Sequence, residues 1–155
     1  MKKIDLGQGL HILANVGVIA GILLLAYELN QNRQMMKAQT RNAISETLVD
    51  LILNEVNSPD LTEIDLKAEA GEALTPVEAR RHDLSWIASF RYWENVHYQY
   101  RIGLYDDSEY LAQREAWREI LAEPGVRDLW CARQNRQSAV FGAEMEALLG
   151  ENRCD

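Results

Sequence analysis

Residues 16–34 read VGVIAGILLLAYELNQNRQ, and the apolar part of this stretch decides what kind of protein the chain forms. Within residues 12–29 the only polar side chains are Asn15, Tyr27 and Glu28. A helix over these residues would be about 27 Å long, which nearly matches a hydrocarbon core of roughly 30 Å. The stretch is therefore predicted to be a transmembrane anchor.

Two other interpretations of the stretch stay open at this point. A cleaved export signal is favoured by the Met1-Lys2-Lys3 start, but cleavage after Ala26 would place Leu24 where a small residue is required. A buried helix would need a body that covers apolar side chains on all sides. The rest of the chain could supply that cover only at the expense of its own core.

The residues that flank the stretch agree with an anchor and slightly favour one orientation of the protein in the membrane. Amphipathic aromatic residues favour the membrane interface, and Tyr27 lies where the apolar run ends. Basic residues close to the run are Arg33, Lys37 and Arg41 after it, and Lys2 and Lys3 before it. Because cytoplasmic flanks are enriched in basic residues, we expect the following body to lie in the cytoplasm.

Small residues in the span and apolar residues after it suggest assembly. Gly17 and Gly21 form a G-x-x-x-G pair, a spacing that lets two helices approach closely in lipid. No Gly or Pro interrupts residues 30–56, where apolar residues recur at helical spacing, so the anchor is expected to continue as one long helix. The residues predicted to mediate assembly are Gly17, Gly21, Met36, Ile44, Leu48 and Leu51.

The remaining chain is predicted to be all-α. Thr75-Pro76-Val77-Glu78 has the pattern of a capping box with proline at the first helical position, and it begins a long helix that Gly103 ends. No stretch alternates polar and apolar residues for long enough to predict a strand. We expect residues 1–29 to form a tail and anchor, and residues 30–155 to form an acidic bundle of about four to five helices.

Charge and cysteine content limit the possible partners. The chain has 16 basic and 24 acidic residues, for a net charge of -8, which opposes binding to nucleic acid. Its two cysteines, Cys131 and Cys154, have no metal-binding spacing. We expect no disulfide framework, a reducing compartment, and Cys131 as a small buried apolar residue.

The helix predicted to start at Pro76 carries the chain's strongest candidate for chemistry. Its aromatic residues share one face, which is typical of a bundle core. Glu94-x-x-His97 has the spacing of half a di-iron carboxylate site, but the second half is missing because Ala79 stands three residues before His82. No catalytic residue, metal site or cofactor is therefore predicted. The alternative is a small-ligand or metal-binding protein or enzyme that uses the aromatic face with Glu94 and His97.

Three segments together resemble a known type of protein: GVIAGILLLAYELNQNRQ with KAQTR after it, RYWENVHYQYRIGLYD, and PGVRDLW. They are similar to a family of small bacterial proteins, mostly proteobacterial, with an N-terminal hydrophobic helix, a polar exit and a helical body. This family has no assigned function, and the similarity extends from about Gly17 to Trp130. The resemblance implies an anchored all-α protein in the bacterial cytoplasmic membrane, and it does not indicate any activity.

These observations favour a non-enzymatic function. A long helix that leaves a membrane packs on its own domain, on copies of itself, or on a larger membrane complex. We therefore expect a single-pass interaction or accessory protein that forms homo-oligomers or docks on a membrane complex.

Overall fold

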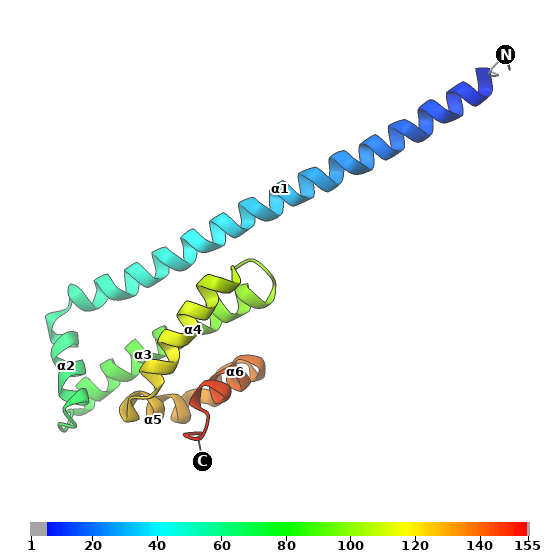
Figure 1. The fold of residues 1–155 in the computed structure, drawn as a ribbon. Coiled ribbons are helices and arrows are strands. Elements are labelled where there is room, and N and C mark those ends of the chain that lie inside the picture. The colour runs from blue at the N-terminus through cyan, green and yellow to red at the C-terminus, as the bar shows by residue number, and fades with distance from the viewer. Residues whose placement is uncertain (1–5, 155) are drawn as a thin grey trace. The chain divides into compact units, whose positions relative to one another are not determined.

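The computed structural model describes residues 6–154, and one helix, α1, makes up the first third of the chain. Helix α1 extends over Leu6–Val56, 51 residues (Figure 1). It continues past the apolar span, as the uninterrupted helical pattern predicted. The chain divides into two compact units, Met1–Gln39 and Thr40–Asp155, so α1 contributes to both. The predicted boundary at residue 29 marks only the end of the apolar run and stays a prediction.

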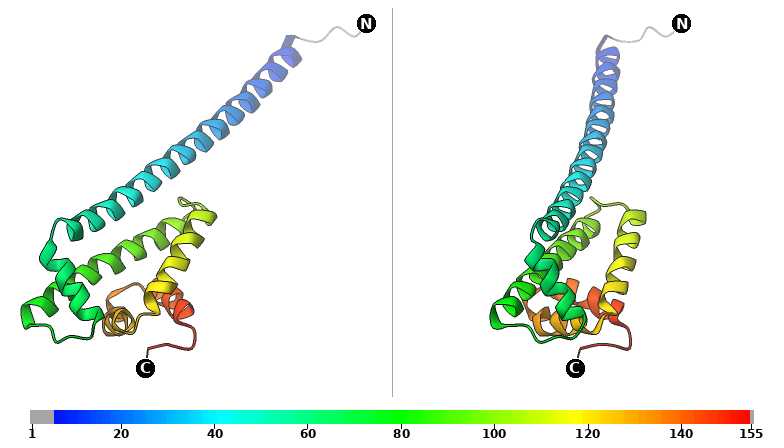
Figure 2. Two further views of the ribbon diagram at one scale, coloured as in Figure 1. Left: turned by 60° about the vertical axis from the view of Figure 1, so that its left-hand side comes forward. Right: turned by 90° about the vertical axis from the view of Figure 1, so that its left-hand side faces the viewer.

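The second unit is a helical body. After α1 it contains five α-helices and one short 3-10 helix, and Figure 2 shows them from two further directions. These are α2 (Pro59–Glu69), α3 (Pro76–Arg101), α4 (Asp107–Leu121), α5 (Pro124–Arg133), η1 (Gln134–Arg136) and α6 (Ala139–Leu149). Residues 6–154 contain no strand, so the all-α prediction is confirmed.

Local sequence signals set the ends of the longest body helix. At the start of α3, the Thr75 hydroxyl accepts a hydrogen bond from the Glu78 N–H at 3.3 Å, and the Glu78 carboxylate accepts one from the Thr75 N–H at 2.7 Å. This confirms the predicted capping box. The Thr75 N–H and then Lys67, 3.0 Å away, lower the pKa of Glu78 to about 2. Gly103 ends the helix with a φ of 77°, which favours glycine.

Helix α3 is central to the body, and its aromatic face forms the core. It contacts α2, α4, α5 and α6. Phe90 packs edge-on against Trp130 with ring centroids 5.3 Å apart, and Trp93 stacks on Trp117 at 5.4 Å. Trp130 also packs edge-on against Phe141 at 5.6 Å. Four helices thus meet through large rings whose burial and edge contacts stabilise the fold.

A disulfide bond joins Cys131 in α5 to Cys154 in the C-terminal tail, with Cα atoms 5.3 Å apart. The predictions that the chain lacks a disulfide and that Cys131 is a free buried thiol are therefore wrong. The tail reverses direction at Gly150, whose φ is 58°, and both cysteines pack against the core. Closing a loop with a sequence separation of 23 residues stabilises a fold by about 3 kcal/mol in the chain-entropy account.

Candidate functional site

The apolar part of α1 is an extended surface that its own chain leaves uncovered. Within residues 6–154, α1 is the one helix long and apolar enough to cross a membrane, and none of its most apolar window is buried. The large exposed side chains of this part are Leu10, Ile12, Leu13, Val16, Val18, Ile19, Ile22, Leu23, Leu24, Leu25, Tyr27 and Leu29. None of this window is packed against the described residues, and a signal sequence or a helix of a soluble protein meets the same test of length and composition.

Two glycines lie within this surface. A Cβ atom added at Gly17 or Gly21 would meet no atom within 4 Å, so neither glycine is required for packing within the chain. Because both residues are small, a second helix could approach α1 closely at these positions. Lys2 and Lys3, which contributed to the predicted orientation, lie outside the described residues.

The predicted assembly residues after the span differ in exposure. Met36 is 45% exposed, but Ile44 is only 2% exposed and belongs to the core of the body. Leu48 and Leu51 are partly buried against the same core. Ile44 is therefore unavailable to a partner, contrary to the prediction, because the body covers this face of α1. The other assembly residues stay predictions.

Glu94 and His97 of α3 both make contacts with other residues of the body. One Glu94 oxygen accepts a hydrogen bond from the Ser138 N–H at 2.7 Å, and the other accepts one from Arg91 at 2.6 Å. His97 is buried against Tyr110 and Phe141, and burial lowers its pKa. No group of three or more His, Cys, Asp or Glu residues in the described part of the chain is placed to hold a metal ion.

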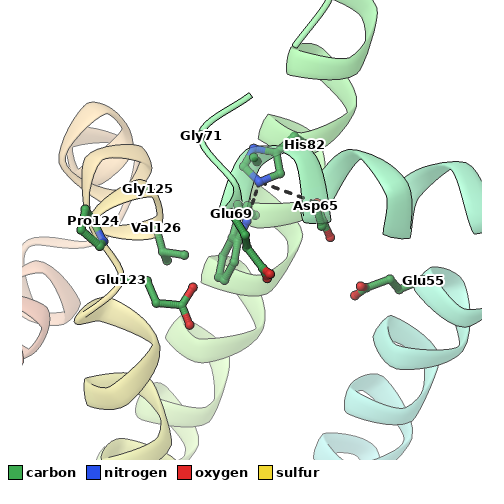
Figure 3. A pocket seen from close by; sticks show the side chains of 11 residues that line it. Glu55, Asp65, Glu69, Gly71, His82, Glu123, Pro124, Gly125 and Val126 are labelled. Atoms are coloured by element: carbon green, nitrogen blue, oxygen red, sulfur yellow. Dashed lines mark hydrogen bonds and ion pairs between the residues drawn. The ribbon is translucent and has the colours of Figure 1, made fainter. Parts of the chain in front are cut away.

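A pocket of about 760 Å³ lies in the body, away from the Glu94 and His97 pair (Figure 3). Its carboxylates come from separate segments, with Glu55 at the end of α1, Asp65 and Glu69 on α2, and Glu123 before α5. The remaining lining residues are Ala68, Gly71, His82, Trp86, Pro124, Gly125 and Val126. The pocket thus combines several acidic groups with an imidazole, an indole and small apolar groups.

In one wall of the pocket, an indole and a carboxylate both lie next to the same histidine nitrogen. The Trp86 indole N–H donates to His82 Nε2 at 3.2 Å, and the same nitrogen lies 3.6 Å from Asp65 Oδ1 (dashed lines in Figure 3). An indole N–H can only donate, so His82 Nε2 is the acceptor of this hydrogen bond. Asp65 Oδ1 is consequently buried without a hydrogen-bond partner.

Burial, and then neighbouring carboxylates, disfavour the ionisation of two pocket acids, Glu55 and Asp65. Burial, and then the nearby Asp65 and Glu69, raise the pKa of Glu55. Burial also raises the pKa of Asp65. The nearby His82 lowers this pKa, and Glu69 raises it further. No Lys or Arg is among the lining residues. The pocket therefore carries more negative than positive charge when its acids ionise, since His82 is the one basic side chain of its lining.

Sequence reasoning missed this pocket. The only local signal is the spacing of His82 and Trp86, which places the two rings on one helix face. The carboxylates are 10 or more residues apart between segments and meet only through the packing of α1, α2 and α5.

Comparisons of the chain with protein-family models, with curated proteins and with solved structures find no match. The resemblance to a family of anchored bacterial proteins stays a prediction.

Proposed function

We propose that this chain is a membrane-anchored, non-enzymatic interaction or accessory protein that forms homo-oligomers or docks on a membrane complex. The observation that carries the proposal is the apolar part of α1, which is long enough to cross a bilayer and entirely unburied within its own chain. A surface of this size is unfavourable in water and favourable in hydrocarbon. The proposed location is the cytoplasmic membrane of a bacterium, crossed once.

Two features of α1 support contacts with other proteins. In the span, Gly17 and Gly21 leave room for a second helix. After the span, α1 exposes apolar side chains at positions i, i+3, i+4 and i+7: Val49, Ile52, Leu53 and Val56. These residues replace Ile44 as the apolar surface available to a partner, because they point away from the core that buries Ile44.

The disulfide changes the proposed orientation of the body. The basic residues after the span favour the cytoplasm only slightly, whereas disulfides are rare there because cellular reductants keep thiols reduced. Both cysteines of the Cys131–Cys154 bond lie in the body, so the compartment that contains the body must allow the disulfide to form. We therefore propose that the body lies on the oxidising side of the membrane.

Thiol trapping in intact cells tests this orientation. Free thiols are blocked with N-ethylmaleimide before lysis, and the denatured protein is then reduced and labelled with a maleimide of large mass. We expect two labels after reduction and none without it. The Cys131→Ser variant is the control, because its remaining Cys154 should be blocked in the cells. Absence of label from the reduced wild-type protein would show that both thiols are free and the body is in a reducing compartment.

The glycine pair is predicted to mediate assembly. Gly17→Leu and Gly21→Leu should each lower the oligomer fraction in mild detergent by about tenfold, because a large side chain separates the helices and removes about 1.4 kcal/mol or more of packing. Native mass spectrometry of the purified full-length protein measures this fraction. Ala26→Leu, a similar enlargement on the opposite face of the span, is the control. Unchanged assembly in both glycine variants would exclude pairing through this face.

A further inference from the structure

We propose that the pocket of the body binds an organic cation, namely a protonated amine on an apolar group. The proposal is independent of the anchoring and assembly proposed above. It rests on the charge of the pocket, on an unsatisfied acceptor in its wall, and on its size and apolar side.

The charge of the pocket selects a positively charged ligand. Four carboxylates line it, and the basic side chains nearest to them in sequence are already paired. Lys67 contacts Glu63 and Glu78 at 3.1 and 3.0 Å, and Arg127 contacts Asp128 at 3.2 Å. The N-terminus of α5 contributes a partial positive charge at Pro124, but the Glu123 carboxylate beside it opposes this charge. An ammonium group would therefore be attracted by carboxylates that no Lys or Arg of the lining neutralises.

The wall at Asp65 also favours a positive charge. Asp65 Oδ1 is buried without a hydrogen-bond partner, because His82 Nε2 accepts the Trp86 indole N–H. Burial without a donor destabilises the ionised carboxylate. The positive charge of an ammonium group in the pocket would stabilise that ionised form.

The size and the apolar side of the pocket select an organic ligand. A volume of about 760 Å³ falls in the range of small-molecule sites, roughly 300–1,000 Å³. Pro124 and Val126 offer apolar contact, and the Trp86 indole offers a face that attracts cations. Trp86 is held in place by ring contacts with Phe90 and Trp93 at 5.7 and 6.4 Å. The described residues contain no group of three acidic, His or Cys ligands placed to hold a metal ion, which disfavours a bare cation.

The test uses the full-length protein in mild detergent and three probes of similar shape: 2-phenylethylammonium, neutral 2-phenylethanol and anionic 3-phenylpropanoate. Isothermal titration calorimetry measures binding at pH 7. We expect saturable binding of the ammonium probe and none of the carboxylate probe. Glu69→Gln should weaken binding about tenfold, the loss expected for one charged contact. Glu69 is exposed at the pocket wall, so this variant should keep its fold.

Glu63→Gln is the matched control, because it removes the same charge from an exposed position on α2 that does not line the pocket. We expect its affinity to stay within about twofold of wild type. Partition of the probes into micelles is common to all variants and cancels in the comparison. Equal binding of 2-phenylethanol, an equal loss in Glu63→Gln and Glu69→Gln, or no saturable binding of the ammonium probe would each overturn the proposal. None of these outcomes bears on membrane anchoring, which is tested by fractionation and particle mass.

Discussion

Replacing both Leu23 and Leu24 by arginine should abolish stable membrane association of the protein. Both side chains are exposed in the middle of the apolar run. An arginine near the centre of a transmembrane helix costs about 2.5–3.5 kcal/mol on insertion scales, so two cost about 5–7 kcal/mol. Only a helix that lies in lipid incurs this cost. Flotation of cell membranes in a density gradient measures the result, because membrane proteins rise with lipid and aggregates do not.

The double variant Leu23→Ile and Leu24→Ile is the control for this experiment. It changes side-chain shape at the same positions and keeps them apolar, so it should float like the wild-type protein. If the double arginine variant floats equally well, the apolar run is not what holds the protein on the membrane. A signal sequence removed after export is distinguished in the same samples, because its loss shortens the wild-type chain.

The second large effect is expected in the core of the body. Trp130 is 0% exposed and lies between the rings of Phe90 and Phe141. Its indole N–H has no hydrogen-bond partner, so the residue acts through packing. Trp130→Ala should lower the free energy of unfolding by about 3–5 kcal/mol, since it removes buried apolar surface and leaves a cavity. That loss is a large part of the 5–15 kcal/mol typical of a whole domain.

Denaturant unfolding of the full-length protein, followed by circular dichroism in mild detergent, measures this change. Leu111→Ala on α4 is the control, because Leu111 is exposed and its truncation should cost no more than about 0.5 kcal/mol. Equal effects of the two substitutions would contradict the assignment of Trp130 to the centre of the core.

The elements that the sequence predicts correctly are those with local causes. The apolar run and the uninterrupted helical spacing after it predict α1, because helix formation depends on neighbouring residues. The capping box at Thr75 predicts the start of α3, since its two hydrogen bonds join residues three apart. The aromatic face of α3 is correctly interpreted as core, because its spacing places large rings on one side of the helix.

The features that the sequence does not reveal depend on contacts between distant segments. Cys131 and Cys154 are brought together by the turn of the tail at Gly150, and two cysteines alone do not specify a bond. Periodicity assigns Ile44 to an apolar face but cannot distinguish a face that packs on its own body from one that packs on a partner. The pocket likewise depends on how α2 packs beside α3, which brings Asp65 to His82.

The most direct test of the central claim is the mass of the intact particle. The full-length protein is extracted from membranes in mild detergent and examined by native mass spectrometry. We predict either a multiple of the 17.7 kDa chain or a complex with a second protein in fixed proportion. The first result would assign the contacts to self-assembly, and the second to docking on a membrane complex. A single 17.7 kDa chain without any partner would contradict the claim that the protein acts through protein contacts.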